Sequence, residues 1–512
     1  MYIAPNSIIH ILKGVPLDNT YRDTILFGTA DEQRAYFVGK NKYTVAQYTY
    51  QRKERKLRIG ITADNLYDCN YIMFQNTAFG NKWFYAFIID VEYVNNEASD
   101  VTFEIDVMQT WHFDYNLRMS YVEREHSTTD EIGANLVPEN LEFGDYMYKD
   151  LGLTSLFDLP QIVVAATFDK DLNDAVGGLY GGVYSGLCYN VFTTYSDVNS
   201  FLERVTTENK SDGIVAIYML PIAFTADYQT TIPEAFELER DKPYNNIDGY
   251  VPKCKKLFTY PYQMLYVTNN EGGAANYPFE YFSTEKCQFK VSGVMCCTPE
   301  VMLVPEYFKN VNLNYNEKLV IGNFPQCAYS IDSFKAFIAQ NAFRIATNMS
   351  IGLVTTAGAA ATAYATGGLV GTGAAISGLT SIANDLATIG DKSTLPPQAK
   401  GSQSSFINFA NEIKGFQFFY AYIRREFAEI IDNYFNMFGY ATHKVKIPNR
   451  NARPHWTYLK TRGVVAVGSV PVDDMAKIKA NYDRGITFWN NGNEIGFYSL
   501  DNSPYPNARK EE

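Results

Sequence analysis

The sequence lacks the residue patterns on which most enzymes and metalloproteins depend. Its five histidines show no HExxH or HxH spacing, its seven cysteines form no CxxC pair, and neither GxSxG nor GxxxxGK occurs. The stretch Gly371-Thr372-Gly373 begins like a dinucleotide-binding loop, but Ile376 stands where the third glycine belongs. We therefore expect no catalytic residue, no metal site and no cofactor.

An excess of basic charge is also absent. The chain carries 44 Lys and Arg against 56 Asp and Glu, for a net charge of −12, whereas general nucleic-acid binders show a basic footprint. An acidic wall would instead repel phosphate and let nucleic acid pass without sticking. The N-terminus has no basic region before its apolar residues, so we expect no signal peptide. We expect the chain to fold in a cytoplasm, with its cysteines reduced and buried.

What the sequence does have is aromatic residues and strand-like alternation. Its 39 Tyr and 34 Phe favour strands, and its 512 residues suggest several domains. Val101 to Met108 alternates with period two and follows the run from Trp83 to Val94 across a polar turn, which predicts a hairpin. Residues 44–51 and 56–64, joined by the charged tip RKER, predict a second hairpin.

The first hairpin would place several carboxylates on one ribbon, where they could be catalytic or could line a surface. Glu104 and Asp106 could form a glycosidase pair, but acids alternating along a solvent or lumen face are far commoner. The four carboxylates concerned are Asp90, Glu92, Glu104 and Asp106.

Farther along, short apolar runs at 157–169 and 212–224 predict buried strands, and residues 197–210 predict a helix. Residues 416–440 could begin as a strand and continue as a helix. The fold class is therefore mainly β with some helix. A basic run near the C-terminus could contact phosphates, form a subunit interface or be ordinary surface paired with acids; it consists of His443, Lys444, Lys446, Arg450, Arg453, Lys460 and Arg462.

No charged side chain occurs between Arg344 and Asp385, and Ala, Gly and Thr make up 24 of these 40 residues. Seven glycines argue against a buried core helix, and the aliphatic residues argue against a plain linker. Gly367-Gly368 divides the segment into two arms of about 20 residues, enough for each to cross a bilayer as a helix. The apolar positions are Ile345, Ile351, Leu353, Val354, Leu369, Val370, Ile376, Leu379 and Ile382.

The arms are only mildly apolar, so one copy would insert weakly. Small residues recur four apart, as at Ala357 and Ala361 or Gly367 and Gly371, and allow close backbone packing. This pattern favours an assembly in which several copies insert together, after being kept from water.

Five stretches carry a resemblance to a known family. They are YIMFQNTAFGNKWFYAFIIDVEYVN (71–95), VTFEIDVMQTWHFDYNLRMSYVEREH (101–126), LPPQAKG (395–401), FGYATHKVKIPNRNARPHWTYLKT (438–461) and RGITFWNNGNEIGFYS (484–499). They resemble the distal tail knob proteins of small short-tailed, protein-primed bacteriophages. The resemblance covers roughly residues 15–126 and 340–500.

The resemblance implies a homohexameric tube that closes the virion tail and contacts the lower collar or tail tube and the tail tip. Hydrophobic loops, here about 343–405, would plug the lumen and then enter the host membrane as a channel for genomic DNA, with Gly367 and Gly368 as hinge. Asp90, Glu92, Glu104 and Asp106 would be possible lumen-lining acids.

We expect four parts: residues 1–126 and 406–512 together as a tube domain, 127–332 as a middle insertion and 333–405 as a helix and loop. The alternatives are a receptor-binding or cell-wall-degrading tail protein, and a structural tube protein whose loop is only a plug.

Overall fold

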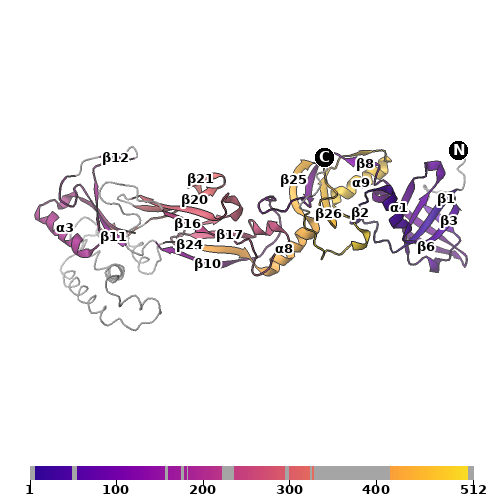
Figure 1. The fold of residues 1–512 in the computed structure, drawn as a ribbon, viewed down its shortest axis with the longest axis horizontal. Coiled ribbons are helices and arrows are strands. Elements are labelled where there is room, and N and C mark those ends of the chain that lie inside the picture. Colours follow the sequence, from indigo (N-terminus) through magenta and orange to yellow (C-terminus); the bar gives the residue numbers. More distant parts are fainter. Residues whose placement is uncertain are drawn as a thin grey trace, which may run out of the picture. The chain divides into compact units, whose positions relative to one another are not determined.

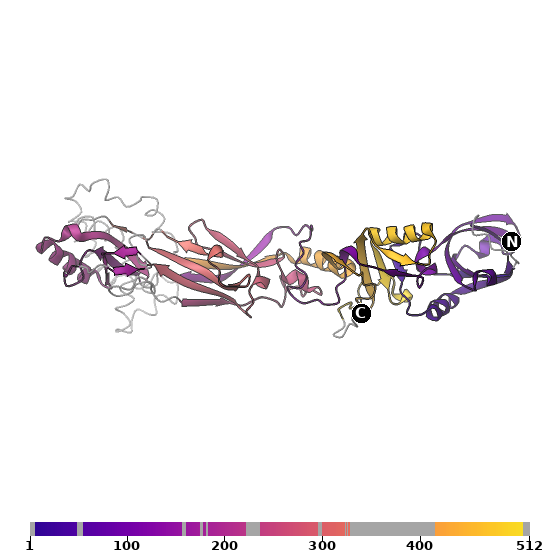
Figure 2. The ribbon, with the colours of Figure 1, turned by 90° about the horizontal axis from the view of Figure 1, so that it is seen from above.

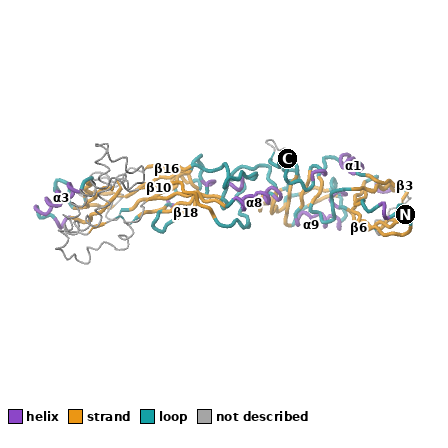
Figure 3. Tube along the Cα trace, turned by 90° about the horizontal axis from the view of Figure 1, so that it is seen from below, coloured by secondary structure: helices purple, strands orange, loops and turns teal. Residues whose placement is uncertain are grey.

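The computed structural model describes residues 6–48, 55–155, 160–174, 178–180, 183–221, 236–294, 299–322, 324, 326–327 and 415–504. The chain divides into two compact units. Unit 1 comprises residues 1–145, 245–262 and 423–512, and unit 2 comprises 146–244 and 263–422. Strands dominate both units, so the fold is mainly β with some helix, as predicted (Figure 3).

Unit 1 contains an antiparallel six-stranded sheet and a five-stranded sheet in which only the β2–β28 pair is parallel. The six-stranded order is β3 (Asn41–Tyr48), β1 (Ser7–Lys13), β5 (Cys69–Gln75), β6 (Trp83–Asn95), β7 (Ala98–Ile105) and β4 (Lys56–Ile59). The five-stranded order is β2 (Asp23–Ile25), β28 (Ile486–Trp489), β26 (Trp456–Arg462), β9 (Ser120–Glu125) and β25 (Tyr440–Lys446). A third pair joins β27 (Ala466–Gly468) to β8 (Tyr115–Leu117).

One apolar core holds the N-terminal and C-terminal parts of unit 1 together. It runs from Ile9 and Tyr71 through Val122 to Ile478 and Phe488. The helices of the unit are α1 (Ala30–Val38), α2 (Val107–Thr110), α8 (Arg425–Phe438) and α9 (Val472–Arg484). Figure 2 shows α9, in yellow, along one side of the C-terminal strands, where Ile478 and Tyr482 are buried.

Unit 2 contains two four-stranded sheets, a five-stranded sheet and a short hairpin. The first sheet has the order β10 (Tyr146–Ser155), β24 (Gly415–Ile423), β17 (Gln263–Thr268) and β18 (Ala274–Tyr277). The second has the order β14 (Cys188–Phe192), β11 (Pro160–Ala166), β15 (Ile214–Pro221) and β23 (Gln326–Cys327). The third joins β16 (Phe236–Arg240), β19 (Cys287–Val294), β20 (Glu300–Phe308) and β21 (Val311–Leu313), with β22 (Leu319–Ile321) also on β20, and the hairpin pairs β12 (Gly178–Tyr180) with β13 (Val183–Ser185).

The sheet that contains β11 is covered on both faces. Val163 and Ala165 join the main core of the unit. Ile162 and Val164 belong to a separate core cluster with Val198, Phe201 and Leu202 of α3 (Tyr195–Thr207). Figure 1 shows α3 beside β11. Burial on two faces explains why β11 is a continuous apolar run rather than an alternating one. Within the described residues, the strands predicted at 157–169 and 212–224 are confirmed as β11 and β15, and the helix predicted at 197–210 is confirmed as α3.

The two predicted hairpins have different outcomes. β6 and β7 pair as predicted, with a tighter turn. The second hairpin is wrong: β3 pairs with β1, β4 pairs with β7, and they form opposite edges of the six-stranded sheet. Both strands find partners that are distant in sequence, which a local pattern does not reveal.

The strand at 416–440 that continues as a helix is confirmed as β24 followed by α8. β24 belongs to a sheet of unit 2, whereas we expected residues from 406 onward in the tube domain. Unit 1 also extends to residue 145 and includes 245–262, both of which we had expected in the middle part.

Candidate functional site at the ends of the uncharged segment

The uncharged segment itself, residues 345–384, lies outside the described residues. So do the hinge Gly367-Gly368, the predicted helix at 333–347 and all nine apolar positions from Ile345 to Ile382 that we expected to plug a lumen. The structure does describe the strands on either side, β23 before the segment and β24 after it.

The two flanking strands are held differently. Among the residues that the structure describes, β23 is the last strand of its sheet and pairs with β15 at Gln326 and Cys327. β24 is an inner strand between β10 and β17, and its Phe416 and Phe418 are fully buried in the core of unit 2. After the segment, the chain therefore enters a strand that is paired on both sides and buried in the core.

A single turn contacts the chain on both sides of the segment. It connects β17 to β18 and comprises residues 269–273. Asn269 donates from Nδ2 to the carbonyl of Val320 at 2.7 Å, and Gly322 donates its N–H to Glu271 at 3.1 Å. On the other side, Asn270 donates to the carbonyl of Gly415 at 3.3 Å.

The turn is itself braced by one side chain. The Asn269 Oδ1 atom accepts from the N–H groups of Glu271 and Gly273 at 2.9 and 2.8 Å, as an Asx turn does. Asn270 at φ +56° and Gly272 at φ +92° adopt the left-handed conformation that Asn and Gly tolerate best. The Asn-Asn-Glu-Gly-Gly stretch is a turn signal in the sequence, but nothing local reveals which distant carbonyls it contacts.

After β24 the chain enters unit 1 as α8, and a buried carboxylate on this helix holds the segment 245–262. Asp432 is fully buried and accepts from the Tyr250 hydroxyl at 2.6 Å. It also accepts from the backbone N–H groups of Lys253 and Cys254, each at 2.8 Å. Three hydrogen bonds meet the needs of a carboxylate that water does not reach.

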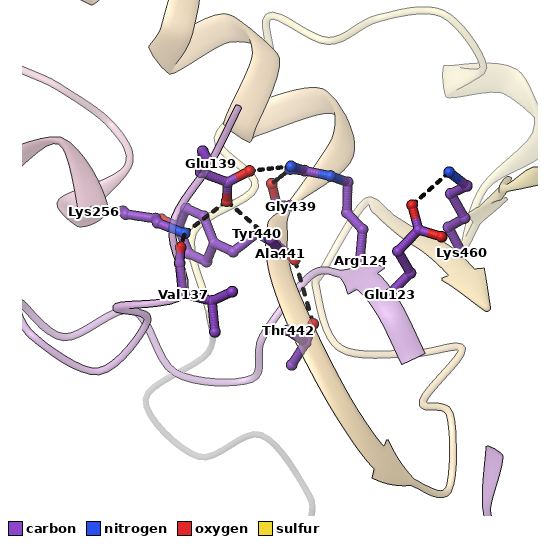
Figure 4. A network of polar contacts seen from close by, with 10 residues as sticks. All are labelled: Glu123, Arg124, Val137, Glu139, Lys256, Gly439, Tyr440, Ala441, Thr442 and Lys460. Carbon is purple, nitrogen blue, oxygen red and sulfur yellow. Dashed lines mark hydrogen bonds and ion pairs between the residues drawn. The ribbon is translucent and has the colours of Figure 1, made fainter. Parts of the chain in front are cut away.

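A second buried carboxylate, Glu139, lies at the centre of the network in Figure 4. Its Oε1 atom accepts from Lys256 Nζ at 2.6 Å and from the N–H of Ala441 at 2.8 Å, and its Oε2 atom pairs with Arg124. Burial lowers the pKa of Lys256, and the nearby Glu139 charge partly opposes that shift. Within unit 1 this network joins residues 127–145, 245–262 and the start of β25.

Gly439 makes the close approach at this network possible. It ends α8 at φ +64° and ψ −153°, and a Cβ atom there would collide with the backbone carbonyl of Glu125. Its own carbonyl accepts from Arg124 at 2.7 Å. Only glycine combines this backbone conformation with that contact.

The expected lining acids do not form one group. Asp90 and Glu92 are exposed on β6, and Glu92 pairs with Lys56, whereas Glu104 is half-buried and pairs with Lys477 of α9 at 2.7 Å. The expectation that Asp106 lines the lumen is wrong, because Asp106 is 1% exposed and faces no surface.

Asp106 ends the strand and caps α2. It accepts from the N–H groups of Met108 and Gln109 and from the Tyr71 hydroxyl at 2.8 Å, and burial raises its pKa to about 6. A carboxylate that we did not single out from the sequence, Asp100, lies on β7 of this hairpin. It lies opposite Glu92 and accepts two hydrogen bonds from Arg58, which together with Lys56 lower its pKa to about 2.

The C-terminal basic run is mostly paired or buried. Lys446 pairs with Glu125, Lys460 pairs with Glu123 at 2.6 Å, and Arg453 is buried. This arrangement fits ordinary surface paired with acids better than a phosphate site.

In the described part of the chain, no group of His, Cys, Asp and Glu side chains could hold a metal ion. The cysteines at 69, 188, 254 and 287 are free and buried. Among the helices that the structure describes, none is both long and apolar enough to cross a bilayer.

Comparison with known proteins identifies relatives of the whole chain. The sequence profile of the C-terminal domain of tail knob protein gp9 from Bacillus phage phi29 matches residues 227–503, and that of the caudoviral major tail protein N-terminus matches residues 5–116. Tail knob protein gp9 of Bacillus phage phi29 and its counterpart in Bacillus phage B103 are each 26% identical, over 96% of this chain and 98% of theirs. The tail knob protein gp12 of bacteriophage C1 shares the fold, with a TM-score of 0.59 at 16% identity over 96% of this chain and 98% of that one.

Proposed function

The chain belongs to the tail knob family of Bacillus phage phi29 gp9, and on that premise we propose that six copies form a tube closing the end of a virion tail. The uncharged segments plug the lumen of this tube. On infection they insert in the host membrane and form a channel for the genomic DNA.

The observation that carries the proposal is where the segment is attached. An uncharged stretch of 40 residues is inserted between two strands of unit 2, and the chain on both sides of it is bonded to the turn at 269–273. Such an attachment lets the segment change its surroundings while both strands stay in their sheets.

The net charge of −12 supports the passage of DNA. Asp90, exposed on β6, is the strongest candidate for lining the lumen, and Glu92 and Glu104 are weaker ones because lysines pair with them. Like charge on a wall prevents phosphates from sticking. The same proposal places other tail proteins, such as the lower collar or tail tube and the tail tip, at the two ends of the tube.

The test uses the assembled full-length protein and dye-filled liposomes. We expect the wild type to release dye and the triple variant Leu353→Asp, Val370→Asp, Leu379→Asp not to, because each buried charge opposes insertion by about 3 kcal/mol. The matched control keeps the same positions apolar, as Leu353→Met, Val370→Ile, Leu379→Met. Equal release by the Asp and control variants would refute the channel.

Electron microscopy of the purified protein tests the assembly separately. We expect a ring with six-fold symmetry and an occluded centre. A ring with an open centre would contradict the plug, and a monomer at all concentrations would contradict the tube.

A wall-degrading enzyme is the alternative function. Incubation with host wall polysaccharide should release no reducing ends if the tube proposal is right. Receptor binding is compatible with the tube and has its own structural support.

A further inference from the structure

The outer face of the β10-β24-β17-β18 sheet departs from the usual pattern of an antiparallel sheet with one buried face. Its inner face packs into the core of unit 2 through Leu265, Val267 and Phe418. The outer face would normally be polar. Instead it presents two distinct rows of side chains, one mainly aromatic and one mainly polar.

The aromatic row crosses three neighbouring strands, which are labelled in Figure 1. It consists of Tyr148 on β10, Phe419 on β24 and Tyr266 on β17. The rings are in mutual contact, with centroids 6.3 Å apart for Tyr148 and Phe419, 6.1 Å for Tyr266 and Phe419, and 5.4 Å for Tyr148 and Tyr266. Tyr148 is 53% exposed, so this ring cluster is open to solvent in unit 2.

The polar row lies two residues from the aromatic row on each of the same strands. It consists of Asp150 on β10, Gln417 on β24 and Thr268 on β17, and Thr268 and Gln417 are directly paired. The Asp150 carboxylate is fixed by the N–H of Gly152 at 2.8 Å and by Gln417 Nε2 at 3.3 Å. Residues two apart in a strand are about 7 Å apart, so a ligand resting on the rings reaches the polar row.

The chemistry of the two rows favours one kind of ligand. A purely apolar partner would desolvate Asp150 and Gln417 without returning their hydrogen bonds. A phosphate-bearing strand would meet the Asp150 carboxylate and a chain of net charge −12. A pyranose ring has an apolar C–H face that stacks on aromatic rings and a rim of hydroxyl groups that can bond to a carboxylate and an amide.

We propose that this face, defined by Tyr148, Phe419, Tyr266, Asp150 and Gln417, binds the pyranose rings of a bacterial wall polysaccharide. Adjacent strands are about 4.8 Å apart, so the aromatic row gives a stacking surface about 10 Å long and suits an oligosaccharide better than a single sugar. This proposal is independent of the membrane channel, so a result that refutes one of the two leaves the other standing.

The experiment measures binding of the full-length protein to two soluble probes, followed by tyrosine fluorescence and by calorimetry. Chitohexaose stands for the amino-sugar backbone of peptidoglycan, and polysaccharide released from host walls stands for the wall-linked polymers. Binding of either probe by the wild type is the expected result, and which one binds distinguishes the two sources.

Two tyrosines give a matched pair of variants. Tyr315 is 53% exposed, like Tyr148, and lies in unit 2 outside this face. We expect Tyr148→Ala to weaken binding about tenfold through loss of one stacking contact, and Tyr315→Ala to change it less than about twofold. Tyr148→Phe keeps the ring and should bind like the wild type.

Three results would overturn the proposal. The wild type could bind neither probe, or Tyr315→Ala could lose as much affinity as Tyr148→Ala. Tyr148→Ala could also change the oligomeric state and leave sugar binding intact, which would make this face a contact between copies. Because Tyr148 is exposed, its variants should fold, and unchanged unfolding midpoints would establish that they do.

Discussion

Glu139 offers a sharp test of how unit 1 holds its connecting segments. The Lys256 side chain is 3% exposed and that of Glu139 is 1% exposed, so neither charge has water as an alternative partner. Glu139→Gln keeps the shape but leaves the Lys256 ammonium and Arg124 without their anion. Breaking a buried ion pair in this way typically costs about 3–5 kcal/mol in the free energy of unfolding.

The location of the tryptophans makes this measurement specific. All four, Trp83, Trp111, Trp456 and Trp489, belong to unit 1, so tryptophan fluorescence during urea unfolding reports that unit alone. We expect Glu139→Gln to lower the free energy of unfolding by about 3 kcal/mol at pH 7, the lower end of the range, because the amide oxygen still accepts one hydrogen bond. Since burial already lowers the pKa of Lys256, this lysine can lose its proton at higher pH, and the loss should be smaller at pH 9.5.

The matched control is Glu429→Gln on α8. Glu429 pairs with Arg425 four residues away at 2.6 Å, but the two side chains are 41% and 60% exposed. Such a pair contributes about 0.3–0.5 kcal/mol. If Glu139→Gln cost no more than Glu429→Gln, or if its cost rose with pH, the reasoning about the buried network would be wrong.

Three further predictions concern single positions. The pKa of Asp106 is raised to about 6 from 3.8, so the folded state binds the Asp106 proton more tightly than the unfolded state does. The contribution of this group to stability therefore falls as pH rises from 4 to 6. Asp106→Asn should remove this pH dependence, and in urea unfolding it should be more stable than the wild type at pH 8. Gly439→Ala should cost at least about 2 kcal/mol, against about 1 kcal/mol for Gly463→Ala, whose φ is also positive but which has open space around it, and equal costs would contradict the close approach to Glu125. Asn269→Ala should speed amide hydrogen exchange of Gly273 and Gly322, because the turn loses its bracing acceptor; unchanged exchange at both would show that the turn does not need this side chain.

Structure that depends on local sequence could be predicted. The alternation of Phe103 and Ile105 predicted the β6–β7 hairpin, and the change from FQFFYAYI to RREFAEII predicted the switch from β24 to α8. The strand that was predicted to continue through Asp106 ends there instead, because the Asp106 side chain accepts from two N–H groups of the following helix.

Long-range pairing was beyond any local pattern. β3 and β4 are neighbours in sequence but lie at opposite sheet edges, because their partners β1 and β7 come from elsewhere in the chain. The hydrogen bonds from the turn at 269–273 to Val320 and Gly415 likewise join groups that are far apart in sequence. Both required the assembled fold, because the groups that meet are separated by up to 145 residues.

The attachment of the segment at one turn makes a prediction that separates a channel from a plug. Because Gly322 and Gly415 both lie beside the turn at 269–273, a short linker should connect the flanking strands without strain. Replacing residues 335–405 by about 12 Gly and Ser residues shortens the connection about threefold, which should stabilise unit 2 by about 1 kcal/mol through reduced loop entropy. Tryptophan fluorescence should show unit 1 unfolding unchanged, whereas hydrogen exchange of β24 should slow. If the shortened protein still forms rings but virions that carry it no longer deliver DNA into liposomes, the segment acts in the membrane. Delivery at normal efficiency would mean that it only fills the lumen, and unfolding of unit 2 would mean that the two ends are not held together as the bonds to the turn imply.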